Sequence, residues 1–245
     1  MRLILCALLA SLPLVAAAEP PLVTDRPDQT ESALAVPKGA WQIEAGWGDA
    51  DGADDALTSL FRIGTHEKVE LRLGIDTFPL GGADDSFDLS LGAKWAIAPE
   101  KGKRPAIALL GAVNRLNGDY PAGTNNEPRP SIRLILSNTL TERLSIGYNV
   151  GVRTVAINTT DDHLVSRAFW TASLGISATE RVGFFVEAFG DGGLSDRAPT
   201  ESSLNGGLTW LVRDRVQLDL FTGGGLADAS SDWFVGTGVS VRLPD

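Results

Sequence analysis

The sequence offers few side chains that could act as catalytic nucleophiles or bases. It has two histidines, His66 and His163, and one cysteine, Cys6. Two aspartates precede His163 and Ser166 follows it, and a serine, a histidine and a carboxylate can form a hydrolytic triad. However, residues three apart on a β-strand point to opposite faces, so His163 and Ser166 would not meet. Because His66 lies in a short charged turn, where a solvated side chain is expected, we predict that the protein is not an enzyme.

No motif for a metal or a cofactor stands out. The run GGGL at 223–226 is not followed by a helical pattern, so it does not match a phosphate-binding loop. Acidic loops such as Asp49–Asp55 could bind Ca²⁺ or bridge lipopolysaccharide phosphates through cations, but solubility is a simpler reason for their composition. The net charge of −10 argues against nucleic acid, whose phosphates bind basic surfaces. We expect no metal ion, no cofactor and no nucleic-acid partner.

Charged residues instead occupy alternate positions of apolar segments. The segments WQIEAGWG (41–48), VELRLGID (69–76) and FDLSLGAKWAI (87–97) alternate between apolar residues and charged or small polar ones. Strict alternation predicts β-strands, and a charged phase is typical of a barrel interior because charges that face lipid are costly. The inward charges, which are candidates for contacting a transported solute, are Glu44, Arg62, Glu70, Arg72, Asp76, Asp88, Lys94, Arg133, Arg153, Arg167, Glu187 and Asp219, with Arg242 in the same phase. Their mixed signs could equally form a ladder of ion pairs that fills a closed barrel.

Short charged turns divide the chain into regular units. The sequences THEK (65–68), TER (141–143 and 179–181) and RDR (213–215) each precede an apolar residue that opens a strand. Each unit has room for two strands of about ten residues, one short turn and one longer loop. The predicted strands are 40–48, 56–64, 69–77, 86–97, 105–116, 131–139, 144–157, 165–178, 182–190, 201–212, 216–225 and 232–243.

These strands predict an all-β fold, a single transmembrane antiparallel up-and-down β-barrel of about twelve strands over residues 40–245. An even strand number, both termini on the short-turn side and longer loops opposite are typical of outer-membrane barrels. The six tryptophans all fall in the apolar phase, as expected for residues that face lipid: Trp41, Trp47, Trp95, Trp170, Trp210 and Trp233. A soluble β-sandwich would bury them between its sheets, and the alternation alone leaves that alternative open.

The first 18 residues have the features of a cleaved secretory signal peptide. Arg2 is followed by an apolar run over 3–15 and by three alanines at 16–18. The apolar run is too short for a membrane-spanning helix. Cleavage would remove Cys6, so the mature chain would have no cysteine for a disulfide bond or a metal site.

Residues 19–39 form a polar segment between the signal peptide and the barrel. Within it, TDRPDQTES (24–32) is too polar to build a core or to span a membrane. We hypothesise that it folds into the periplasmic mouth as a plug, because its acidic residues could neutralise lumen arginines and Arg26 could pair with Glu44 or Glu70. The plug candidates are Asp25, Arg26, Pro27, Asp28 and Glu31. A mobile periplasmic tether is the alternative.

The start of the mature chain resembles a known family. TDRPDQTESALAVPKGAWQIEAG (24–46) and LFRIGTHEKVELRLG (60–74) are similar to the opening of the outer-membrane family named for the MetA pathway of phenol degradation. The resemblance implies an outer-membrane β-barrel that acts in transport, with aromatic or other hydrophobic compounds as solutes. One departure is the C-terminus, where Leu243 stands in place of the terminal aromatic residue that the assembly machinery usually reads.

We therefore expect a transporter or channel for small molecules in the bacterial outer membrane. Membrane lipid, lipopolysaccharide and the outer-membrane assembly machinery are the expected partners, and the sequence does not name the solute. A twelve-stranded barrel lies between small barrels that side chains fill and large ones that leave a water channel. A filled structural barrel without a pore, or less favourably an outer-membrane hydrolase, is the alternative function.

Overall fold

The computed structural model describes residues 20–53, 55–78, 86–117, 127–157, 163–194 and 199–243. The predicted signal peptide, most of the long loops and the side chain of His163 lie outside the described residues. Within these ranges, no helix is long and apolar enough to cross a membrane.

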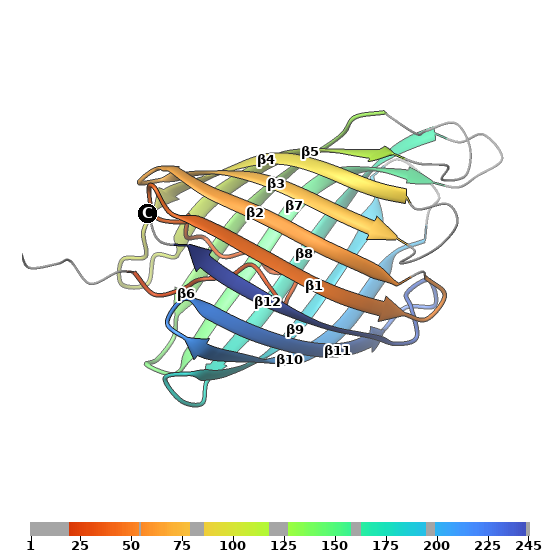
Figure 1. Cartoon of the computed structure of the whole chain (residues 1–245). Helices are drawn as coiled ribbons and strands as arrows, with labels where there is room; N and C mark the ends of the chain where they lie inside the picture. Colours follow the sequence, from red (N-terminus) through yellow and green to blue (C-terminus); the bar gives the residue numbers. More distant parts are fainter. Residues whose placement is uncertain are drawn as a thin grey trace, which may run out of the picture.

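Twelve β-strands make up the described fold (Figure 1). Every predicted strand is present, and the ends differ from the prediction by no more than about three residues. The strands are β1 (Trp41–Ala50), β2 (Ala56–His66), β3 (Val69–Phe78), β4 (Ser86–Ala98), β5 (Ala106–Asn117), β6 (Arg129–Thr139), β7 (Leu144–Ile157), β8 (His163–Ser177), β9 (Val182–Gly193), β10 (Glu201–Arg213), β11 (Val216–Gly225) and β12 (Phe234–Leu243).

The sheet closes into a barrel because the first and last strands pair with each other. Each strand is antiparallel to its neighbour in the chain, and β1 pairs with β12 from Trp41↔Leu243 to Ala50↔Phe234. Closure gives every strand two partners, so no edge presents unpaired backbone groups to lipid. The predicted all-β barrel is therefore confirmed.

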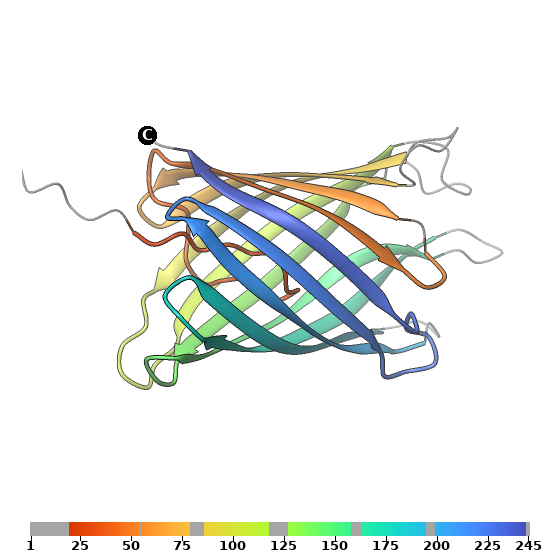
Figure 2. The ribbon, with the colours of Figure 1, turned by 60° about the horizontal axis from the view of Figure 1, so that its bottom comes forward.

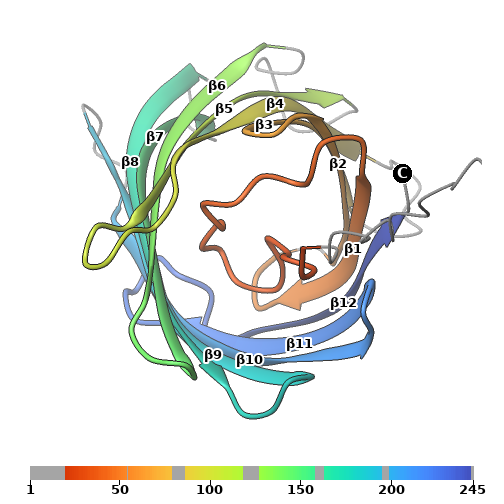
Figure 3. The same cartoon turned by 90° about the vertical axis from the view of Figure 1, so that its left-hand side faces the viewer.

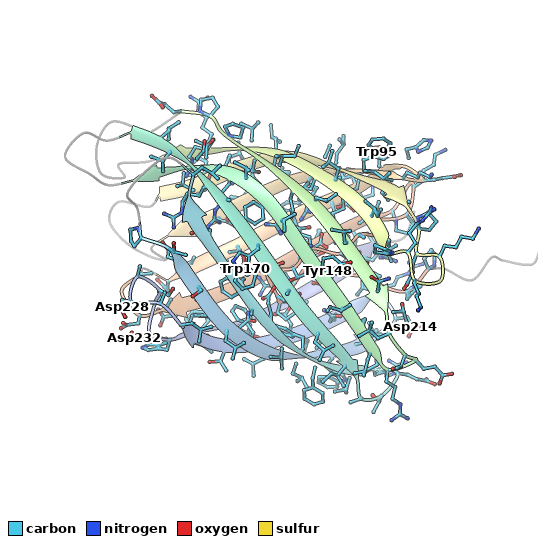
Figure 4. The ribbon with its side chains drawn as sticks, turned by 180° about the vertical axis from the view of Figure 1, so that it is seen from behind. Trp95, Tyr148, Trp170, Asp214, Asp228 and Asp232 are labelled. Carbon is cyan, nitrogen blue, oxygen red and sulfur yellow. The ribbon has the colours of Figure 1, made fainter. Side chains whose placement is uncertain are left out.

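The two phases of the strands face opposite sides of the barrel wall, as predicted. Apolar residues such as Leu91 and Leu220 point outward and are 60% and 52% exposed, whereas Glu44 and Lys94 point inward and are buried. All six tryptophans are between 37% and 52% exposed, and Trp170 lies on the outside near the middle of the barrel (Figure 4). A soluble sandwich would bury these rings, so the exposed apolar belt identifies a membrane barrel of the outer-membrane type.

The short turns lie at one end of the barrel, and the strand ends that lead into the longer connections lie at the other. Figure 4 shows Asp214, in a short turn, at the end opposite Asp228 and Asp232. The repeated Thr-Glu-Arg sequence has a local reason, because the hydroxyl of Thr141 accepts hydrogen bonds from the backbone N–H groups two and three residues later, at 3.2 and 3.0 Å. Thr179 does the same in the next turn of this type.

Candidate functional site

The N-terminal segment lies inside the barrel. Figures 2 and 3 show it entering at the short-turn end, crossing the lumen and returning to β1. Val36 and Ala33 are almost fully buried, and Ala33 packs on a small apolar patch formed by β5 and β6. Near its exit the backbone of Pro37 approaches Gly64 so closely that a Cβ there would lie 2.0 Å from the Pro37 carbonyl oxygen. We call residues 24–36 the lumen segment.

One side of the lumen segment is held by a network of charges, which we call the ionic anchor. Its members are Asp25 and Glu31 of the lumen segment with Glu44, Arg62, Glu70, Arg72 and Lys94 of β1–β4. One carboxylate oxygen of Asp25 lies 3.1 Å from Arg62, 3.3 Å from Arg72 and 2.7 Å from Lys94. Glu31 pairs with Arg72 and lies 3.2 Å from Lys94. Asp25 and Glu31 of the segment thus bridge three cations of the wall.

The strand register places two like charges side by side next to Asp25. Arg62 and Arg72 are direct cross-strand partners on β2 and β3, and like charges in such positions repel. Asp25 lies within ion-pair distance of both guanidinium groups, so it adds to the neutralisation that Glu44 and Glu70 of the wall already provide. On the next strand pair, Glu70 faces Lys94 directly.

The ionic anchor also binds the backbone of the segment. The carboxylate of Glu44 accepts hydrogen bonds from the N–H groups of Asp25 and Arg26, at 3.0 and 3.1 Å. The carboxylate of Glu70 accepts one from the N–H of Val36, at 2.7 Å. The anchor therefore fixes the path of the chain as well as its side chains.

The opposite side of the segment touches β7–β9 through mostly neutral groups, which we call the tip contact. The hydroxyl of Thr30 lies 2.8 Å from the hydroxyl of Thr171 and donates to Glu187 at 2.6 Å. The N–H of Gln29 donates to Glu187, and Asn149 exchanges hydrogen bonds with the backbone of Glu31. No ion pair joins the tip of the segment to β7–β9 within the described ranges.

Asp28 faces a like charge in the tip contact. Burial raises the pKa of Asp28 to about 8, the nearby Glu187 carboxylate adds to this increase, and a hydrogen bond from Ser173 opposes it. The sequence hypothesis assigned Asp28 to the neutralisation of lumen arginines, and the geometry places it beside another carboxylate instead. Pro27, next to it, is buried.

The two acidic side chains that the lumen segment contributes to the ionic anchor, Asp25 and Glu31, respond differently to burial. Burial raises the pKa of Asp25 to about 6 against the attraction of Arg62. Burial acts on Glu31 in the same direction, but Arg72 and Lys94 hold the pKa of that carboxyl well below its usual range. Glu31 therefore carries the firmer negative charge of the two.

The partner of Arg26 differs from the one expected. Its guanidinium lies 3.1 Å from Asp219 on β11, whereas Glu44 and Glu70 are both bound by Arg62. Arg62 occupies the space between these two glutamates, so their carboxylates are not available to the Arg26 side chain.

Two glycines make room for Arg26 on the wall. A Cβ at Gly46 of β1 would lie 2.2 Å from the guanidinium carbon, and one at Gly238 of β12 would lie 2.5 Å from Nε. The planar group therefore lies flat against the seam where the barrel closes, and its Nη1 donates to the hydroxyl of Thr58 at 3.1 Å.

Above Arg26, on the long-loop side, lies a cavity of about 360 Å³ that we call the outer chamber. Phe189, Phe221 and Phe234 project into it from β9, β11 and β12, with ring centroids 6.0 Å apart for Phe189–Phe234 and 6.5 Å apart for Phe221–Phe234. A Cβ at Gly236 would lie 2.4 Å from the Phe221 ring, so the ring lies against the glycine backbone rather than across the lumen. No sequence pattern predicted this chamber, although these phenylalanines share the inward phase with Asp219 and Arg242.

The remaining predicted lumen residues lie on the other wall. Arg72, Asp76, Asp88, Arg133 and Arg153 line a second cavity of about 420 Å³. The guanidinium groups of Arg133 and Arg153 lie 4.8 and 5.8 Å from the ring centroid of Phe169, within the range of a cation–π interaction. Arg167 is paired with Asp191, which also binds Arg153.

On the short-turn side of the segment lies a third cavity, of about 470 Å³, which we call the inner chamber. Its walls are formed by the lumen segment and by small residues of β6–β10 such as Ser137, Ser173 and Thr209. Arg26 borders both the outer and the inner chamber. The lumen segment thus separates two spaces that open toward opposite ends of the barrel.

The sequence matches a known family, and the fold matches solved structures. The profile of the family described as "Putative MetA-pathway of phenol degradation" matches residues 24–243. A comparison with curated proteins found no match.

Solved structures share the barrel at low sequence identity. The NanC porin superimposes with a TM-score of 0.62 and 11% identity, over 83% of this chain and 100% of its own. The KdgM porin has a TM-score of 0.58 and 12% identity, over 83% and 99%. The COG4313 outer membrane channel from Pseudomonas putida F1 has a TM-score of 0.58 and 12% identity, over 86% and 98%. At this identity, the similarity establishes the barrel fold.

Proposed function

Because the chain belongs to the family named for the MetA pathway of phenol degradation, we propose that it is an outer-membrane channel for small organic molecules, closed in this conformation by its own lumen segment. The observation that carries the proposal is the pair of chambers that Arg26 and its neighbours separate. A barrel filled for stability alone would not need open space on both sides of a buried segment.

Aromatic compounds are the proposed solutes. The pathway in the family's name degrades phenol, and the outer chamber presents three phenylalanines to a molecule that enters from the long-loop side. The structural relatives include a porin and an outer-membrane channel, which agrees with a transport role for this protein.

A structural barrel without a pore is the second candidate, and the ionic anchor supports it. In that case, the buried ion pairs that Arg62 and Lys94 form would serve only to fill the lumen.

Other expectations from the sequence remain predictions. They are the absence of enzymatic activity, the absence of a bound metal ion or cofactor, and contacts with lipopolysaccharide and the assembly machinery.

Single-channel recording in planar bilayers separates the two candidates. The refolded mature protein should show low or brief conductance, and a variant that lacks residues 19–32 should show long, discrete openings. Heat-modifiable migration in gel electrophoresis checks that both forms contain a folded barrel. If both forms fold, insert and stay silent, the lumen is filled and the channel proposal is wrong.

A further inference from the structure

The outer chamber has the size and lining of a ligand site. A cavity of about 150 Å³ lined by apolar side chains holds a benzene molecule, so the 360 Å³ of the outer chamber leave room for one substituted ring. The ring of Phe234 is tilted by 58° relative to Phe189 and by 51° relative to Phe221, an arrangement that lets a further ring pack against an edge or a face.

One polar group on the floor of this chamber has a donor to spare. A guanidinium has five N–H donors, and four of those in Arg26 are used by Asp219, Thr58 and the carbonyl oxygen of Thr237. The fifth, on Nη1 beside Thr58, has no hydrogen-bond partner in the part of the chain that the structure describes. Arg26 and Thr58 both line the chamber, and 16% of the Arg26 side chain is exposed.

We propose that the outer chamber binds a single-ring compound that carries an anionic oxygen, with the ring among the three phenylalanines and the oxygen on Nη1 of Arg26. The ligand class is that of aromatic carboxylates and related ring anions. The role of this site depends on the proposed channel function, because a solute that enters from the long-loop side would occupy the site immediately before it reaches the lumen segment.

The wall chemistry makes Asp219 a competitor for such a ligand. Asp219 is buried and forms an ion pair with Arg26. Its two carboxylate oxygens accept hydrogen bonds from Nη2 and Nε of Arg26, at 3.1 and 3.4 Å, so it binds the same guanidinium that the ligand would bind. Glu201 and Asp49 are the other acidic residues of the lining, and Glu201 is half exposed and lies 3.7 Å from Arg167. Asp76 is a further acidic neighbour that interacts with the Arg26 charge. An anion in the chamber therefore meets one cation that is already partly neutralised, and removal of the Asp219 charge should strengthen its binding.

Calorimetric titration of the detergent-solubilised barrel with benzoate and with benzamide tests the site. The two probes have nearly the same shape, but only benzoate is an anion at neutral pH. Wild-type protein should bind benzoate more tightly than benzamide. Arg26→Gln should lose about tenfold or more of the affinity for benzoate while binding benzamide within about twofold of wild type.

Two further variants separate the ring from the charge. Asp219→Asn should increase the affinity for benzoate, since the guanidinium loses its competitor. Phe234→Ala should weaken both probes, and Phe184→Ala, on the lipid-facing side of β9, is its control and should weaken neither.

The proposal is wrong if Arg26→Gln binds benzoate as tightly as wild type, or if wild type binds benzamide as well as benzoate. Retained benzamide binding shows that Arg26→Gln is folded. Binding in detergent needs no conducting pore, so a failure of the channel proposal in bilayers and a failure of this site give different results.

Discussion

The lumen segment meets the barrel wall in two different ways. Along β1–β4 the ionic anchor binds it through buried charges of both signs, with Asp25 in contact with three cations. Along β7–β9 the tip contact uses hydroxyl, amide and backbone groups around one carboxylate, Glu187. Breaking a buried ion pair costs far more than breaking neutral hydrogen bonds. The comparison indicates that the segment would open by releasing its tip while the anchor stays in place.

Breaking the ionic anchor should have the largest effect. Glu31→Gln removes a charge that pairs with Arg72 and Lys94. These two cations hold the pKa of Glu31 well below its usual range, so the closed state favours the charged form. Loss of one partner from a buried charge network costs about 3–5 kcal/mol, so the open probability in planar bilayers should rise by about a hundredfold or more. An unchanged open probability would mean that the anchor does not hold the segment.

Raising the pH should have the second-largest effect, because it should release the tip of the lumen segment. The pKa of Asp28 is about 8 in the closed conformation, above its ordinary 3.8, so the closed state binds a proton that a released segment would lose. The resulting stabilisation of the closed state is complete below the ordinary value and is lost as the pH rises toward about 8. The open probability should therefore increase by about tenfold or more between about pH 5 and about pH 8.5.

Asp28→Asn is the control for this pH dependence. The variant keeps the hydrogen-bonding shape but cannot ionise, so its recordings should vary much less over the same pH range. An equal pH response in the variant would assign the effect to another group, with Glu187 and Asp25 as the nearest carboxyls.

Weakening the tip contact directly should have a smaller effect. Thr30→Val keeps the shape of the side chain but removes the hydrogen bonds to Thr171 and Glu187. A loss of about 1–2 kcal/mol should shorten the closed lifetime by about tenfold. Thr30→Ser, which retains the hydroxyl, should behave like wild type, and a change of the same size in both variants would point to packing instead.

The smallest effect is expected at an ion pair far from the lumen. Arg181 and Asp214 lie 3.4 Å apart in the short turns, with 54% and 89% of their side chains exposed. Asp214→Asn also replaces a carboxylate with an amide, as Glu31→Gln does, yet it should alter the open probability by less than about twofold because water screens the pair. A large change there would show that charge removal acts through the whole barrel rather than through the anchor.

The sequence determined the wall of this protein. Alternation of apolar and polar residues is a local property with a period of two, so it placed twelve strands and both faces correctly, from the exposed Trp41 to the buried Glu44. The turn sequences and the motifs that carry the family resemblance could be recognised in the same way, since each depends on a few adjacent residues.

Only the tertiary structure decided which residues meet inside the barrel. Arg26 pairs with Asp219, 193 residues away, because closure of the barrel brings β11 and β12 beside β1 and β2. Asp28 faces Glu187 and the phenylalanines of the outer chamber converge for the same reason. Lumen contacts depend on closure and on the path of the segment across the barrel, and no short stretch of sequence contains either.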